Sequence, residues 1–132
     1  MSPLTPGARL HDRYLLERRI GAGGMAQVWL AHDSVLGRQV AVKTLIGEAA
    51  ADPGLRAGAR REAQAAAKLT HPNITAVHDY GEHESTPYIV MELLHGETLA
   101  DRLARGPLSW PQAAAIGGQV AGALAAAHAQ GV

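Results

Sequence analysis

Residues 20–31 read Ile-Gly-Ala-Gly-Gly-Met-Ala-Gln-Val-Trp-Leu-Ala, a glycine cluster followed by an alternating apolar run. Glycine lacks the side chain that would keep backbone N–H groups away from phosphate oxygens. A dinucleotide-binding loop opens a helix, and a Walker loop is closed by Gly-Lys-Ser/Thr. Neither pattern follows here, so the stretch predicts a phosphate-binding loop between two antiparallel strands. Taken alone, the cluster also fits a flexible hairpin turn.

Around this loop, the sequence predicts an α+β fold with an antiparallel sheet. Alternating apolar residues bounded by turn residues indicate five strands, at 14–20, 27–31, 39–45, 74–80 and 88–92. Residues 52–69 predict a helix with Asp52 as N-cap and Pro53 at its first position. The Pro-rich residues 1–12 predict a loose lead-in.

After His95-Gly96 the apolar period becomes helical. Thr98 with Asp101, and Ser109 with Gln112, have the spacing of capping boxes that open two helices. The second helix carries an apolar stripe listed as Ile116, Val120, Leu124 and Ala127. Its Ala-rich run at 113–127 is shorter than the roughly 20 apolar residues of a membrane span, so it predicts a buried helix of a soluble domain.

A lysine and a glutamate are the candidate charged groups of a phosphate site. In Val40-Ala41-Val42-Lys43, alternation places Ala41 and Lys43 on one face, where the small alanine leaves room for a flat ring and the lysine can reach phosphates beyond it. Glu62, on the predicted helix, could fix the lysine's position. A surface lysine and a solvated helix charge, with Arg60 and Arg61 beside it, are the alternatives.

Together these elements resemble the N-terminal lobe of eukaryotic-like protein kinases, and most closely bacterial, actinobacterial-type serine/threonine kinases. Three further segments match this family in order and spacing: His71–Ile74, Tyr88–Glu92 and Gly96–Leu99. The resemblance covers residues 12–132. It implies an N-lobe with a five-stranded antiparallel sheet and one regulatory helix at 12–94, after a lead-in at 1–11. A hinge and two helices of an incomplete C-lobe would then occupy 95–132.

The resemblance also implies an ATP site. Lys43 would bind the α- and β-phosphates and pair with Glu62, and Met91 resembles the gatekeeper. The Glu92 carbonyl and the Leu94 amide would hydrogen-bond adenine. The residues that would cover the phosphates are Gly21, Ala22, Gly23, Gly24, Met25 and Ala26. The residues that would roof the adenine are Ile20, Val28 and Ala41.

One loop residue departs from the family pattern, and one set of family motifs is missing. Ala26 stands at the third glycine position of Gly-x-Gly-x-x-Gly. If the backbone needs positive φ at this position, alanine is tolerated poorly there. The sequence contains neither His-Arg-Asp nor Asp-Phe-Gly. Mg²⁺ is expected for the complete family, but its ligands are absent here. The sequence therefore predicts a truncated kinase, inactive alone, with an unpartnered apolar face on its last helix.

The resemblance implies ATP and, in a complete kinase, protein substrates as partners, and composition argues against several other partners. Twelve basic and twelve acidic residues balance, so no net field attracts nucleic acid or an anionic membrane. The chain has no cysteine, and its seven histidines lack close zinc-ligand spacing, so no metal site is expected. Residues 1–11 show no signal peptide, which favours a cytoplasmic location.

A non-catalytic module is the second hypothesis. It would bind nucleotide weakly from one side, or dock on another kinase through its sheet, for example as an N-lobe homodimer. A dinucleotide-binding oxidoreductase is disfavoured because a strand, not a helix, is predicted after the glycine loop.

Overall fold

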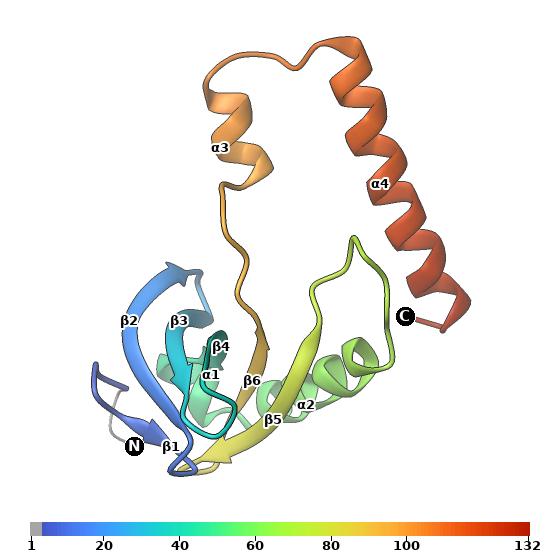
Figure 1. Cartoon of the computed structure of the whole chain (residues 1–132). Coiled ribbons are helices and arrows are strands. Elements are labelled where there is room, and N and C mark those ends of the chain that lie inside the picture. Colours follow the sequence, from blue (N-terminus) through green and yellow to red (C-terminus); the bar gives the residue numbers. More distant parts are fainter. Residues whose placement is uncertain (1–3) are drawn as a thin grey trace.

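The computed structural model describes residues 4–132 and contains a six-stranded antiparallel sheet (Figure 1). The order across the sheet is β1-β2-β3-β4-β6-β5. The strands are β1 (Arg9–Leu10), β2 (Tyr14–Ala22), β3 (Ala26–Asp33), β4 (Arg38–Leu45), β5 (Val77–His83) and β6 (Thr86–Glu92). The α+β class and the five predicted strands are confirmed, and the strand count is corrected to six.

Four helices accompany the sheet: α1 (Gly47–Ala51), α2 (Pro53–Ala67), α3 (Leu99–Ala104) and α4 (Trp110–Ala129). The Asp52 carboxylate accepts from the backbone N–H groups of Gly54 and Leu55, which confirms the predicted N-cap of α2. Both predicted capping boxes are present at α3 and α4. The prediction missed α1, a five-residue helix that has no side-chain cap.

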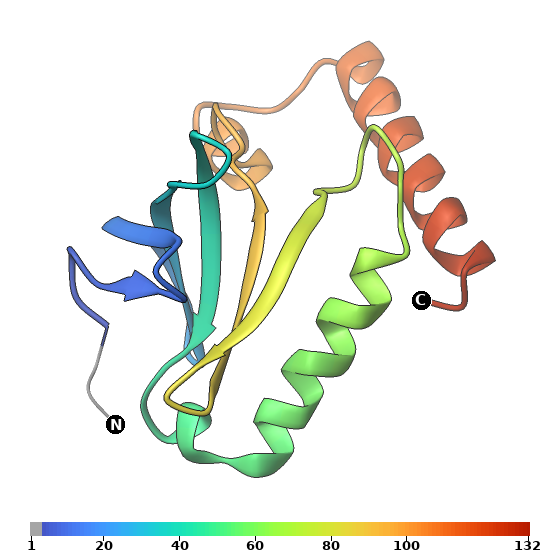
Figure 2. The same cartoon turned by 60° about the horizontal axis from the view of Figure 1, so that its bottom comes forward.

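The main hydrophobic core lies on one face of the sheet. Leu10, Tyr14, Trp29, Val42 and Val90 belong to it, each at most 2 % exposed. Strand β1 pairs with β2 at the edge of the sheet and places Leu10 in this core, so the expectation of a loose lead-in is wrong for residues 4–12; residues 1–3 lie outside the described part. Helix α2 runs alongside β5 (Figure 2), with Ala63 as its buried residue.

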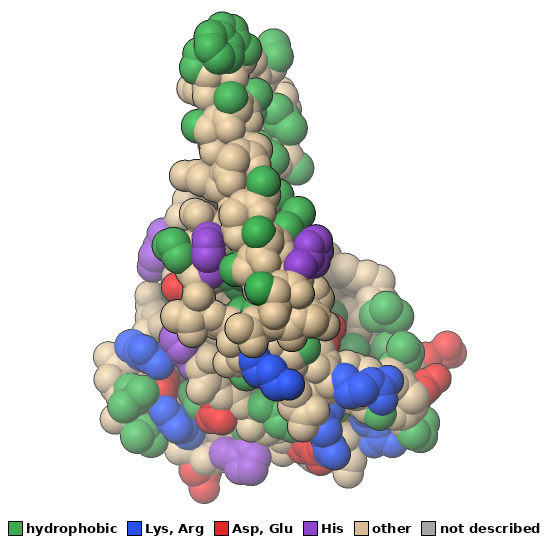
Figure 3. All heavy atoms as spheres, turned by 90° about the vertical axis from the view of Figure 1, so that its right-hand side faces the viewer, with side chains coloured by type: hydrophobic (Ala, Val, Ile, Leu, Met, Phe, Trp, Pro, Cys, Tyr) green, Lys and Arg blue, Asp and Glu red, His purple; other side chains and the backbone are tan. Residues whose placement is uncertain are grey.

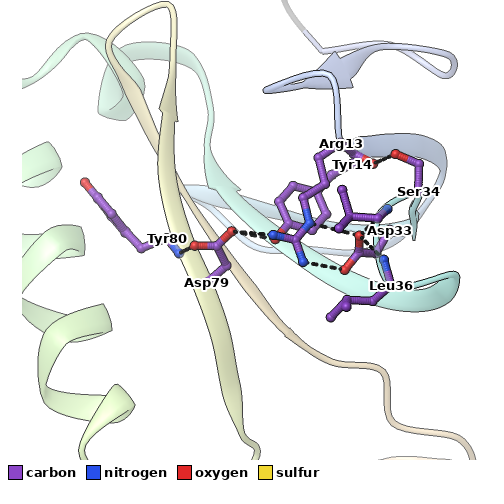
Figure 4. Close-up of polar contacts among 8 residues, drawn as sticks. Arg13, Tyr14, Asp33, Ser34, Leu36, Asp79 and Tyr80 are labelled. Carbon is purple, nitrogen blue, oxygen red and sulfur yellow. Dashed lines mark hydrogen bonds and ion pairs between the residues drawn. The ribbon is translucent and has the colours of Figure 1, made fainter.

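A buried carboxylate locks the start of β2 to the end of β3 (Figure 4). Asp33, 1 % exposed, forms two 2.9 Å hydrogen bonds with the Arg13 guanidinium. The same carboxylate accepts from the N–H groups of Val35 and Leu36 in the β3–β4 turn. The Arg13 guanidinium holds the pKa of the Asp33 carboxyl well below its usual range.

A second bond extends this network to β5. The Tyr14 hydroxyl donates to the Asp79 carboxylate, and burial raises the pKa of that phenol. Arg13 lies over the Tyr14 ring, 5.0 Å from its centroid. Polar contacts therefore connect the start of β2 both to β3, the next strand, and to β5, which lies far from it in sequence.

Helices α3 and α4 extend away from the sheet (Figure 1). No residue of α4 is buried, so the prediction of a buried helix at 113–127 is wrong for this chain. The predicted unpartnered stripe is confirmed, since Val120 and Leu124 are each 50 % exposed. Figure 3 shows hydrophobic side chains along this helix, and residues 110–132 contain no Lys, Arg, Asp or Glu. Among the described residues, no helix has the length and apolar character to cross a membrane.

We expect Asp33→Asn to lower the free energy of unfolding by about 2 kcal/mol at pH 7, because a buried, charge-assisted pair loses its anion. The folded-state pKa of Asp33 is lowered, so the carboxylate's contribution is fully present above its unfolded-state pKa of about 3.9 and is lost as the pH falls below it. The difference between wild type and variant should therefore shrink between pH 5 and roughly pH 2. Urea denaturation at about pH 7, 5, 3 and 2 measures this difference.

Glu17→Gln is the matched control, since Glu17 is an exposed carboxylate on the neighbouring strand. It should leave the urea midpoint nearly unchanged at each pH. A difference for Asp33→Asn that stays constant down to pH 2 would show that the ionised carboxylate is not what stabilises this corner.

Candidate functional site

The face of the sheet opposite the main core carries the predicted site residues. The registers pair Val28 with Lys43 and Lys43 with Ile89 across β3, β4 and β6. Ala41 pairs with Met91 in the same way. Residues directly opposite each other in a sheet point to the same side. The structure therefore brings Val28, Ala41, Lys43 and Met91 to one face, with Ala41 and Lys43 two residues apart along β4.

Lys43 forms an ion pair with Glu62 of α2. The Nζ–Oε1 distance is 3.3 Å, and the two side chains are 37 % and 64 % exposed. The expected contact is thus present, between two side chains that both remain exposed to solvent. An exposed pair of this kind contributes only about 0–1 kcal/mol to stability, so its consequence is chiefly to orient the ammonium.

A small cavity lies at this ion pair. Its volume is about 120 Å³, and Lys43, Glu62, Met25 and Ala26 are among the lining residues. The ion pair and the tip of the glycine loop therefore face a common space. Ile89 and Ala59 also line it, and the sequence analysis did not assign them to the site. Counting back by two from Met91 along β6 would have identified Ile89.

The glycine loop is a tight reversal between β2 and β3. The Gly23 N–H donates to the Ala26 carbonyl at 2.9 Å, and the Ile46 N–H donates to the Met25 carbonyl at 3.0 Å. Ala26 is the first residue of β3 and is not among the residues with positive φ. Alanine at the family's third glycine position therefore introduces no backbone strain. The strand after the loop confirms the prediction that distinguished it from a helix-opening loop.

The end of β6 is held by reciprocal bonds between Glu92 and Ala76. The Glu92 N–H donates to the Ala76 carbonyl, and the Glu92 carboxylate accepts from the Ala76 N–H, each at 3.0 Å. Leu94, two residues on, is 66 % exposed. Ile20 lies at a register irregularity between Arg19 and Gly21, so it has no directly opposite partner on β3.

Within residues 4–132, no group of three or more His, Cys, Asp or Glu side chains is placed to hold a metal ion. The groups that the described site brings together are one ammonium, the Glu62 carboxylate that holds it, and an apolar face of the sheet. This combination suits a polyanion attached to a flat apolar group.

Comparison with known proteins gives the family. A family model described as "Protein kinase domain" matches residues 14–132. The chain is 53 % identical over 108 residues to a probable serine/threonine-protein kinase, SCO3848, of Streptomyces coelicolor, covering 79 % of this chain and 16 % of that protein. It is 47 % identical over 138 residues to the serine/threonine-protein kinase PknA of Mycobacterium tuberculosis, covering 100 % of this chain and 32 % of PknA.

Solved structures agree with these relatives. The crystal structure of the Mycobacterium tuberculosis PknI kinase domain superimposes with a TM-score of 0.84 at 32 % identity, covering 98 % of this chain and 53 % of that one. The chain thus spans a third or less of these two curated relatives and about half of the PknI kinase domain. A matching sheet, a matching family model and relatives of this identity lead to one conclusion: the chain belongs to the bacterial serine/threonine protein kinase family.

Proposed function

We propose that this chain forms the ATP-binding part of a serine/threonine protein kinase, with ATP held between the glycine loop and Lys43. The observation that carries the proposal is the 3.3 Å Lys43–Glu62 ion pair, which lines one small cavity together with Met25 and Ala26 of the loop. A lysine fixed in this way can meet phosphate oxygens without first having to be ordered.

The glycines of the loop support the same reading. Neither Gly23 nor Gly24 has positive φ, and a Cβ added at either would meet nothing within 4 Å. The fold itself therefore does not require glycine at these two positions. Close approach of a ligand to the backbone would require it, as in phosphate-binding loops.

The remaining assignments follow from the shared face. Val28 and Ala41 lie on the side of Lys43 and, with Ile20, would cover the adenine, while Met91 would close the back of the pocket. The backbone of Glu92 and Leu94, in the segment steadied by Ala76, would meet the adenine edge. In this division residues 12–94 form the N-lobe and residues 95–132 begin the C-lobe.

ATP supplies the γ-phosphoryl group that kinases transfer to a Ser or Thr hydroxyl. Transfer needs carboxylates that hold Mg²⁺ and a residue that orients the acceptor, and the family motifs that provide them are not in these 132 residues. We therefore infer that the isolated chain binds nucleotide without transferring phosphate. A complete kinase would also bind protein substrates, and a second kinase would dock on its sheet.

We expect Lys43→Met to weaken binding of a fluorescent ATP analogue about tenfold, the loss of one charge-assisted bond to phosphate. The chain has only two lysines, so Lys68→Met, at the C-cap of α2, is the same substitution at the other one. That control should bind like the wild type. Equal affinity in all three proteins would remove Lys43 from the nucleotide site.

Gly23→Ala should separate binding from folding. The free energy of unfolding should stay the same or rise by about 0.4–1 kcal/mol, because alanine fits the conformation and restricts the unfolded chain. Nucleotide affinity should fall, because the methyl group stands between backbone and phosphate. Gly37→Ala is the contrasting control: its φ of +66° predicts lower stability with unchanged affinity. If Gly23→Ala binds the analogue like the wild type, the loop does not contact phosphate.

Glu62→Gln should weaken nucleotide binding less than Lys43→Met, since it loosens the ammonium without removing it. Glu48→Gln, an exposed carboxylate of α1, should have no effect. A larger loss for Glu62→Gln than for Lys43→Met, measured by the same titration, would mean that Glu62 does not act through the lysine.

A further inference from the structure

A second, larger cavity lies behind the sheet, on the side away from Lys43. Its volume is about 570 Å³. Gln27, Trp29, Thr44 and Tyr88 line it from β3, β4 and β6. Each of these residues alternates along its strand with a residue of the Lys43 face, so the cavity and the proposed nucleotide site are separated by one layer of sheet.

Three segments outside the central strands complete the walls. They are the N-terminal stretch from Leu4 to Pro6, the β4–α1 junction with Ala50 of α1, and the β5–β6 turn. The turn and α1 lie at the same end of the sheet in Figure 2. A cavity of this size falls within the roughly 300–1,000 Å³ of small-molecule sites.

The inner wall is apolar and aromatic, with one polar atom unpaired. Its apolar lining residues include Trp29, Tyr88, Leu45, Ile46 and Ala50. Trp29 is 2 % exposed, and its indole N–H has no hydrogen-bond partner among the described residues. Because that N–H is itself covered, Trp29 offers a ligand the apolar surface of its ring.

Arg19 supplies a positive charge to the lining of this cavity. Arg19 of β2 lies directly opposite Trp29 in the β2–β3 register, so both side chains point to the cavity side. Arg19 is exposed and forms no ion pair with any residue of the described chain. At the far wall, Glu84 is already engaged in another interaction and His83 is beside it. Arg19, which has no ion-pair partner among the described residues, thus lies on the Trp29 side of the cavity.

We propose that this cavity binds a small amphipathic anion, with its apolar body against Trp29 and Tyr88 and its carboxylate or phosphate at Arg19. The site is distinct from the nucleotide site, because Gln27, Trp29 and Tyr88 line it from the opposite face of the sheet, and the two cavities share only Thr44 and Leu45 at the end of β4 among their lining residues. It is also in contact with the glycine loop, since Ile46 lines the cavity and donates its N–H to the Met25 carbonyl.

Intrinsic fluorescence tests the proposal without any nucleotide, so its outcome is independent of the ATP assignment. The chain has two tryptophans, and Trp110→Phe, at an 82 % exposed position, leaves Trp29 as the only indole. This variant is titrated with decanoate, decyl phosphate and decanol, each below the concentration at which it aggregates. Either anion should give a saturable change in Trp29 emission, and decanol should bind at least fivefold more weakly. The stronger of the two anions identifies the head group.

Two matched pairs of variants locate the ligand. In the Trp110→Phe background, Arg19→Ala should weaken anion binding at least fivefold, while Arg18→Ala, the same change on the Lys43 face, should not. Ala50→Leu fills cavity space and should abolish binding, whereas Ala51→Leu lies on an exposed position of the same helix and should not.

Circular dichroism checks that each variant is folded. If Ala50→Leu does not fold, the comparison of Arg19→Ala with Arg18→Ala tests the site. Calorimetric titration with the same three compounds provides a second readout should Trp29 emission stay constant. Absence of saturable binding by both methods would overturn the proposal, as would equal affinity for decanol and the anions. Equal anion affinity in the Arg19→Ala and Arg18→Ala variants would also refute the site.

Discussion

The alternation of side chains along a single strand, β4, is the constraint on which this structure depends. Val42 is fully buried in the hydrophobic core on one side of the sheet. The next residue, Lys43, points to the other side and meets Glu62. Because the period is two, a shift of one residue in the pairing of β4 would bury the ammonium and expose the valine. The energy of the core therefore sets the position of the charged group.

Features controlled by local sequence could be predicted, and those that need distant partners could not. The caps at Asp52, Thr98 and Ser109 use bonds to residues two or three positions along, so their spacing is visible in the sequence. Strand β1 is two residues long, and its stability comes from pairing with β2 and from the burial of Leu10. Nothing in the Pro-rich lead-in specifies that pairing.

The same distinction holds at the candidate site. Lys43 and Glu62 were expected to meet because the family resemblance places a helix after the third strand, and the ion pair is present. Ile89 was missed because it precedes the residues chosen for the gatekeeper and the hinge, and its position beside Lys43 becomes clear only from the β4–β6 register. Alanine at position 26 was the doubtful point of the loop, and its strand conformation removes the doubt about φ. The cavity lined by Trp29 depends on the fold of the lead-in, so no sequence pattern indicates it.

The exposure of α4 has a consequence for its amide protons. None of its residues is buried, and an added Cβ at Gly122 would lie 3.9 Å from the His71 ring, so this helix touches the α2–β5 loop over a small area. Its backbone amides are protected by the helix's own hydrogen bonds. In the centre of the sheet, by contrast, exchange with solvent deuterium requires β4 to separate from β3 and β6. One chain thus combines a slowly exchanging sheet with a helix whose protons exchange through local fraying.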